Sequence, residues 1–173
     1  MLPLAHVGFT TTAVKLLAKS LKINHIDYRL LIPASLLPDL LDKPIAGVFR
    51  GIYSYESRAV GHSFVFLGCL GLMLLLQYFF CRKHWLLPVL IGVACHDILD
   101  AMWLHPEIFW WPLYGWDFYV PSNEAWQGDF RLGQYKINQL DLLDNVSVLL
   151  LLYFLMNMAL QKRIFRFFRE GDL

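Results

Sequence analysis

The sequence predicts an all-α fold, a polytopic helical membrane protein with about 3–5 membrane-embedded helices. Of the 173 residues, 57% are hydrophobic and only 17% are charged, and the mean hydropathy of +0.46 exceeds that of an ordinary soluble domain. Residues 63–80 contain no charged side chain. At about 1.5 Å per residue, a helix of this length just crosses a hydrocarbon core of roughly 30 Å. With no repeat and no low-complexity linker, residues 1–173 are predicted to form one domain.

The two N-terminal apolar segments are the weaker candidates for membrane helices. Leu2–Leu21 is interrupted by a histidine and two lysines, and Leu30–Leu41 is short and contains Pro33 and Pro38. Both segments are therefore expected to be tilted, re-entrant or half-buried. No basic region precedes the first apolar segment and no evident cleavage site follows it, so a removable signal peptide is not expected.

Three later segments are predicted to span the membrane. The first is Ser63–Phe80. Trp85–Leu104 follows it closely, with Pro88 in its first turn, where the missing N–H costs little. The two should form a tight antiparallel hairpin. The last is Val146–Leu160, extended at its start by two leucines.

Charge and cysteine content exclude several classes of function. The formal net charge of +1 lacks the basic footprint of a nucleic-acid-binding protein. The three cysteines, Cys69, Cys81 and Cys95, lie inside apolar segments. We expect small core residues there rather than a disulfide framework.

The basic residues predict the orientation in the membrane. Ten of the fifteen fall in three groups, which the positive-inside rule places in the cytoplasm together with the C-terminus. These groups are Lys15, Lys19, Lys22 and Arg29; Arg82 and Lys83; and Lys162, Arg163, Arg166 and Arg169. The remaining five, Lys43, Arg50, Arg58, Arg131 and Lys136, are then outside.

Ionisable residues in or beside apolar segments indicate a functional site, because a histidine or aspartate at membrane depth must be paired, bound to a metal or hydrated. Five such residues should fall toward the outer face: His6, Asp39, His62, His96 and Asp100. His96 and Asp100 are four residues apart on one helical face, and the predicted hairpin brings His62 near Asp100. Nitrogen and carboxylate ligands suit a divalent metal, first of all zinc.

Alternative interpretations remain for the neighbouring polar residues. Asp97 is expected to orient a metal-binding histidine or to cap the outer end of its helix. Asp39 itself and Asp42 could each cap a turn, and Ser63 is expected to be an N-cap rather than a nucleophile. Asp141 and Asp144 are expected to be solvated residues at a helix start. A last group is expected at the interface: His25, His84 and His105.

Four motifs together resemble the LexA-regulated membrane-bound metal-dependent hydrolase family (YdjM-like), over roughly the first 115 residues. They are Leu37-Pro38-Asp39, Ser57-Arg58-Ala59-Val60-Gly61-His62-Ser63, His96-Asp97-Ile98-Leu99-Asp100 and Trp111-Pro112. The resemblance implies an all-helical fold related to the zinc-dependent phospholipase C and nuclease group, with the five residues above as metal ligands and Arg58 as a substrate-contacting or supporting group.

The chain departs from the family pattern at three positions. Ser57 stands where the family run begins with His, Gly61 replaces its Thr, and the second acid of the Leu-Pro-Asp run comes one residue late, as Asp42. The missing imidazole could remove a ligand of a second metal, for which Glu56 is a possible substitute.

The predicted function is metal-dependent phosphoester hydrolysis at a bacterial inner membrane, on a lipid or lipid-linked substrate, with Arg58 and Asp97 as catalytic candidates. The alternative is a non-enzymatic membrane protein that holds a structural metal or a buried polar network. The aromatic stretch Trp103–Trp126 is interpreted as a membrane-interface belt or, alternatively, as a segment that covers the site.

Overall fold

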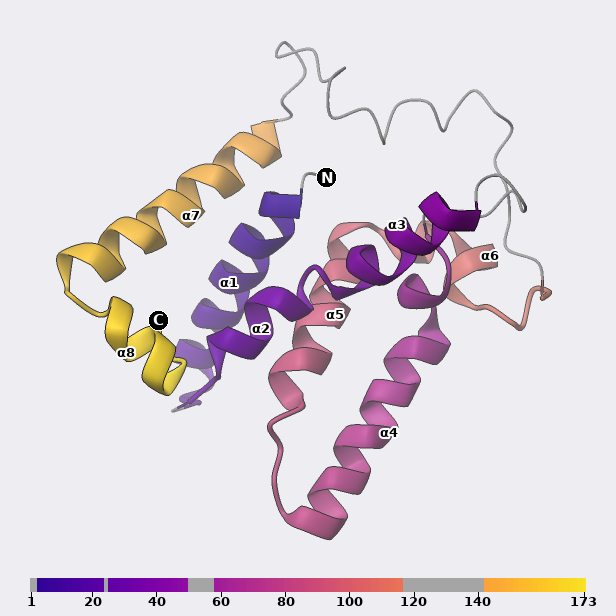
Figure 1. The fold of residues 1–173 in the computed structure, drawn as a ribbon, viewed down its shortest axis with the longest axis horizontal. Coiled ribbons are helices and arrows are strands. Elements are labelled where there is room, and N and C mark those ends of the chain that lie inside the picture. Colours follow the sequence, from indigo (N-terminus) through magenta and orange to yellow (C-terminus); the bar gives the residue numbers. More distant parts are fainter. Residues whose placement is uncertain (1–2, 24, 50–57, 117–141) are drawn as a thin grey trace.

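The computed structural model describes residues 3–23, 25–49, 58–116 and 142–173, and within them the fold is all-helical (Figure 1). Some residues with sequence-based predictions lie outside these ranges: Arg50, Glu56, Ser57, Trp126, Arg131, Lys136 and Asp141. In chain order the elements are α1 (Pro3–Ser20), α2 (Tyr28–Ala34), α3 (Leu37–Phe49), the 3₁₀ turn η1 (Val60–His62), α4 (Phe64–Cys81), α5 (Leu87–Leu99), the 3₁₀ turn η2 (Met102–Leu104), α6 (Pro106–Phe109), α7 (Leu142–Leu160) and α8 (Ile164–Glu170).

Helix α4 agrees with the predicted span to within one residue. It starts where predicted because Ser63 is its N-cap, with the hydroxyl oxygen accepting a hydrogen bond from the Phe66 amide at 3.2 Å. Its C-cap, Arg82, has a left-handed backbone with φ of 54°. The N-cap prediction for Ser63 is therefore confirmed.

The prediction of one helical segment over Trp85–Leu104 is wrong, because the helix is shorter. Helix α5 covers only Leu87–Leu99, with Pro88 in its first turn as expected. The helix cannot continue because Ala101 adopts a left-handed conformation with φ of 53°, and the chain then turns into η2. Helices α4 and α5 still form an antiparallel pair whose open ends meet (Figure 1).

The second N-terminal segment is two helices instead of one. Helix α2 ends at Ser35, whose amide donates to the Leu31 carbonyl, and α3 begins at Leu37 with Pro38 in its first turn. The break leaves the Ser35 carbonyl outside both helices. This carbonyl becomes part of the site described below.

One helix in the described residues, α4, is long and apolar enough to cross a membrane. A second candidate exists if α7 and α8, which meet at a bend of 100°, count as one span. The larger predicted number of about 3–5 embedded helices stays a prediction.

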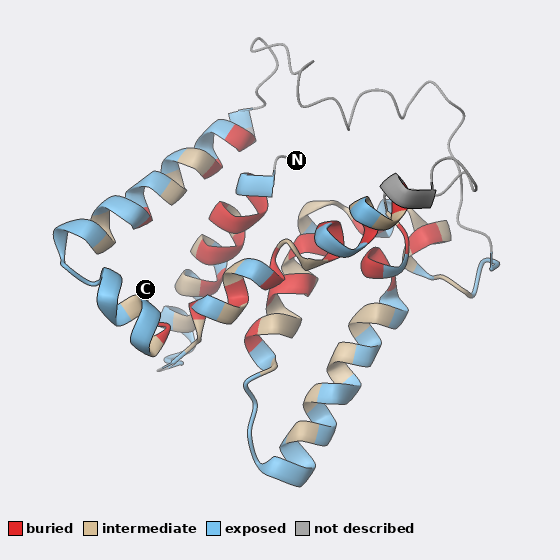
Figure 2. Cartoon of the chain, in the orientation of Figure 1, coloured by how far each residue is buried: buried red, intermediate tan, exposed pale blue. Residues whose placement is uncertain are grey.

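Helix α4 has no buried residue, in contrast to the centre of the molecule (Figure 2). Cys69 and Cys81 lie on it and are exposed, so their assignment as core residues is wrong, while Cys95 on α5 is half-buried. The reason is that α4 contacts mainly α5 and η1 and leaves most of its apolar side chains exposed. All three cysteines are free, as predicted.

The start of α7 differs from the expectation of solvated acids. Asp144 is only 4% exposed, and Ser147 is fully buried. Both lie where α7 packs along α1, close enough that a Cβ added to Gly8 would meet the Ser147 carbonyl oxygen at 2.5 Å. The prediction of a solvated Asp144 is therefore wrong, because this carboxylate is buried at the start of α7, one turn before the α1 contact at Ser147.

The contact of α5 with α2 gives a stability prediction. A Cβ added to Gly92 would lie 2.7 Å from the Ala34 Cβ and 2.9 Å from the Leu31 carbonyl oxygen, so Gly92→Ala is expected to cost about 1–3 kcal/mol. Gly68→Ala on α4 is the matched control, because nothing lies within 4 Å there. Thermal unfolding in detergent should show a lower midpoint for Gly92→Ala than for wild type, and no lowering for Gly68→Ala. Equal midpoints in the two variants would contradict the close contact between α5 and α2.

Candidate metal centre

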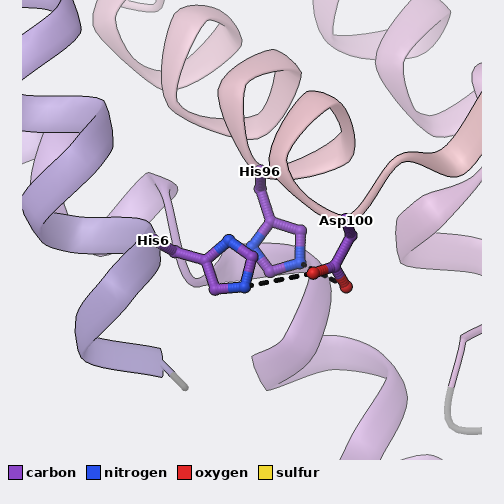
Figure 3. A group of neighbouring side chains, drawn as sticks. All are labelled: His6, His96 and Asp100. Carbon is purple, nitrogen blue, oxygen red and sulfur yellow. Dashed lines mark ion pairs between the residues drawn. The ribbon is translucent and has the colours of Figure 1, made fainter. Parts of the chain in front are cut away.

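The structure brings all five candidate ligands to one buried junction. His6 comes from α1, Asp39 from the first turn of α3, His62 from η1, and His96 and Asp100 from the end of α5. Figure 3 shows His6, His96 and Asp100 converging. Two triads each place one ligand atom per residue within 4.8 Å of the others: His6, His96 and Asp100, and Asp39, His62 and His96. The three histidines are fully buried.

Asp39 and Asp100 each place one carboxylate oxygen near the same pair of histidine nitrogens. The Nε2 atoms of His62 and His96 are 3.1 Å apart. The Asp39 Oδ1 atom lies 3.8 Å and 4.0 Å from these two nitrogens, and Asp100 Oδ2 lies 3.9 Å from each. Zinc bonds of 2.0–2.2 Å place tetrahedral ligand atoms about 3.3–3.6 Å apart. The nitrogen–nitrogen and nitrogen–oxygen separations of 3.1–4.0 Å differ from these values by a few tenths of an ångström.

The orientation of the two rings is fixed by hydrogen bonds at their other nitrogens. His96 Nδ1 donates to the Ser35 carbonyl oxygen at 2.7 Å, and His62 Nδ1 donates to the Asp42 carboxylate at 2.8 Å. Because both partners only accept hydrogen bonds, both Nδ1 atoms carry the proton in the neutral rings. The two Nε2 lone pairs then face each other at 3.1 Å, which is unfavourable unless a proton or a cation lies between them.

His6 occupies the other side of Asp100. Its Nε2 atom lies 3.2 Å from Asp100 Oδ1, and its ring stacks on the His96 ring with centroids 4.1 Å apart. The two oxygens of Asp100 are thus divided, one toward His6 and the other toward His62 and His96. His6 can serve as a fifth ligand or hold Asp100 in place.

Asp42 supports the cluster in a way that the sequence analysis did not assign to it, although it noted this acid in the Leu-Pro-Asp motif. The prediction that it caps a turn is wrong: it is fully buried in α3, and its carboxylate accepts hydrogen bonds from the Ala59 and Gly61 amides at 2.7 Å and 2.9 Å as well as from His62. Its spacing of three residues from Asp39 puts both acids on one helical face, and this signal could have identified it. Such partners orient metal-binding histidines.

Two cations stand at the outer edge of the cluster. Arg58 Nη2 lies 2.9 Å from Asp100 Oδ2, and Lys43 Nζ lies 2.6 Å from Asp39 Oδ2. The Arg58 and Lys43 side chains are 29% and 39% exposed, while the two carboxylates are 5% and 11% exposed. The cations therefore connect the buried acids with the surface.

The remaining sequence candidates contribute no ligand atom to the two triads. Asp97 is buried, and neither carboxylate oxygen has a hydrogen-bond partner among the described residues, so no contact supports an orienting or capping role. Its catalytic role stays a prediction. His25 and His84 are exposed, and His105 lies 3.7 Å from Glu107. The described members of the aromatic stretch include Trp103 and Trp116, both largely exposed.

Fold and site together define the class: an all-helical protein, within the described residues, with one helix able to cross a membrane and a histidine–aspartate cluster that could hold a metal ion. The chain belongs to the YdjM inner membrane protein family, whose model matches residues 1–164. No curated protein and no solved structure matches it. The match confirms the YdjM-like resemblance, extends it beyond the first 115 or so residues, and supports an inner-membrane location.

Proposed function

We propose that this protein is a metal-dependent phosphoester hydrolase that acts on a lipid or lipid-linked substrate. The observation that carries the proposal is the pair of Nε2 atoms of His62 and His96, held 3.1 Å apart with their protons on the opposite nitrogens. A divalent cation between them would relieve the repulsion of the lone pairs. Asp39 and Asp100 add two negative charges beside it.

The donor set favours zinc as the first ion to test. Two imidazole nitrogens and two carboxylate oxygens are common zinc ligands, and two carboxylates balance the charge of a divalent ion. His6, through its contact with Asp100, is proposed as the residue that completes or supports this set.

In the proposed reaction, each residue has a role that follows from its contacts. When bound, the ion lowers the pKa of water to about 7 and offsets the charge that develops on phosphorus. Asp42 and the Ser35 carbonyl keep the two rings oriented toward the ion. Arg58, partly exposed and bonded to Asp100, is placed to contact a phosphate oxygen, and guanidinium geometry suits that contact. Asp97 stays a catalytic candidate.

The position of the cluster supports a lipid substrate. It lies beside the first turn of α4, the helix best suited to cross the membrane. The Phe64 ring in that turn contacts Phe109 and Trp110, with centroids 6.0 Å and 5.0 Å away, and aromatic residues favour membrane interfaces. The basic residues at the far ends of α1 and α4 favour an outward-facing site and a cytoplasmic C-terminus.

The test combines metal analysis with hydrolysis on the same detergent-purified samples. Wild-type protein is expected to contain stoichiometric metal and to hydrolyse a member of a panel of phospholipids and lipid-linked phosphates, with activity lost after chelation. Arg58→Gln should keep the metal and lower kcat/KM by about 10- to 100-fold, because it removes a charge-assisted contact. Arg166→Gln, at an exposed residue of α8, is the control and should change neither.

Two outcomes would decide against the proposal. Wild-type protein without metal would contradict the metal centre. A metal-loaded protein inactive on every phosphoester would instead favour the structural alternative, in which the ion or a shared proton joins His62 and His96 without chemistry.

A further inference from the structure

We propose that Lys43 and Arg58 form a two-cation clamp that binds the phosphoryl group of the substrate over the metal centre. The inference rests on the proposed function and adds to it a second anion-binding residue, Lys43, which contacts Asp39 as Arg58 contacts Asp100. A phosphoryl group is the ligand class because it offers at least two non-bridging oxygens, one for each cation. Such charge-assisted hydrogen bonds are among the strongest in proteins.

Lys43 and Arg58 make the same kind of contact with the cluster, an ion pair with a carboxylate. Each one contacts a different candidate carboxylate ligand, Lys43 through Asp39 and Arg58 through Asp100. The two oxygens of Asp39 have different neighbours. Its Oδ1 atom lies 3.8 Å and 4.0 Å from the Nε2 atoms of His62 and His96, whereas Oδ2 accepts a hydrogen bond from Lys43 at 2.6 Å. The Asp39 carboxylate therefore lies between the Lys43 ammonium group and the two histidine nitrogens.

Exposure distinguishes the clamp from the rest of the site. The histidines and Asp42 are fully buried, whereas Lys43 and Arg58 are the polar groups of the cluster that reach the surface. An anion that approaches the centre from solvent thus meets these two side chains first. The Lys43 ammonium has three donors and Asp39 Oδ2 takes one of them, so further donors can turn to a phosphate oxygen.

The competing explanation is an ordinary ion pair between residues four apart on a helix. Lys43 and Asp39 have this spacing, and exposed pairs of this kind contribute only about 0.3–0.5 kcal/mol to helix stability. An ion pair alone would let Lys43 act on anion affinity only through its charge at a distance, which salt screens. The two explanations therefore differ in a measurable quantity, the affinity of the metal-loaded protein for phosphate.

The experiment measures metal content first and then phosphate binding by calorimetry in detergent. The probes are inorganic phosphate and a short-chain phosphatidylglycerol. Lys43→Gln and Arg58→Gln should retain metal and bind the probe about tenfold more weakly, since each loses one charge-assisted contact. Lys43→Arg should restore most of the affinity. Lys83→Gln is the control and should match wild type, because Lys83 is exposed in the turn between α4 and α5, at the opposite end of α4 from His62.

The outcomes separate the clamp from the proposed function. Wild-type protein without metal would refute the metal centre itself. With metal present, unchanged affinity in Lys43→Gln, loss of its metal, or no binding of either probe to wild type would each overturn the clamp. Weakened binding of inorganic phosphate would support recognition of the phosphoryl group alone; weakened binding of the lipid only would support the clamp with a lipid headgroup as its source.

Discussion

Replacing His96 or Asp100 with alanine is expected to remove bound metal and abolish hydrolysis together. His96 is the residue common to both triads of potential ligands, and Asp100 divides its two oxygens between His6 and the pair His62 and His96. Loss of a partner that only orients a ligand typically costs 10- to 100-fold in affinity or activity, so loss of a ligand should cost at least about 100-fold. Metal content and turnover are measured on the same purified samples.

His25→Ala and His105→Ala are the controls, because both side chains lie outside the cluster. They should keep wild-type metal content and activity. Retained metal in both His96→Ala and Asp100→Ala would contradict the assignment of these residues as ligands. The contrast with Arg58→Gln is also informative, since that variant should lose catalysis and keep metal.

Asp42→Ala is expected to have the second-largest effect, on stability and on metal affinity at once. The substitution leaves the Ala59 and Gly61 amides and the His62 Nδ1–H without their buried acceptor. Breaking such a buried charged network typically costs about 3–5 kcal/mol. Metal affinity should fall about 10- to 100-fold, because the His62 ring is no longer held.

Two further variants keep this prediction testable if Asp42→Ala folds poorly. Asp42→Asn retains one acceptor oxygen and should give an intermediate loss of metal affinity. Val14→Ala, in the apolar core cluster with Tyr28 and Leu31, should destabilise by about 2 kcal/mol and leave metal affinity unchanged. Equal metal affinity in Asp42→Asn and wild type would contradict the orienting role of Asp42.

The candidate ligands could be identified from the sequence because the cost of ionisable groups in apolar segments is local information. His6, His62 and His96 interrupt or border such segments, and all three are buried at one junction. Likewise, the uncharged run of residues 63–80 was sufficient to predict α4, and Ser63 was sufficient to predict its start. These features depend on residues close together in the chain.

Other features were predicted incorrectly because they depend on distant packing. Asp42 was interpreted as a turn cap, yet its hydrogen-bond partners are 17 to 20 residues away in the chain. Asp144 was expected to be solvated, yet it is buried where α7 and α1 pack together. The end of α5 was placed too late, because nothing in the composition of the apolar segment revealed the left-handed residue Ala101.

The sequence by itself therefore determined the helical class and the chemistry of the candidate donor set, since hydropathy and residue type are properties of the chain. Only the tertiary structure decided which histidine nitrogens face each other. That orientation depends on the Ser35 carbonyl, 61 residues before His96, and on the Asp42 carboxylate, 20 residues before His62. Whether a ring nitrogen donates or accepts a hydrogen bond depends on the partner beside it, and these partners come near the rings only in the folded protein.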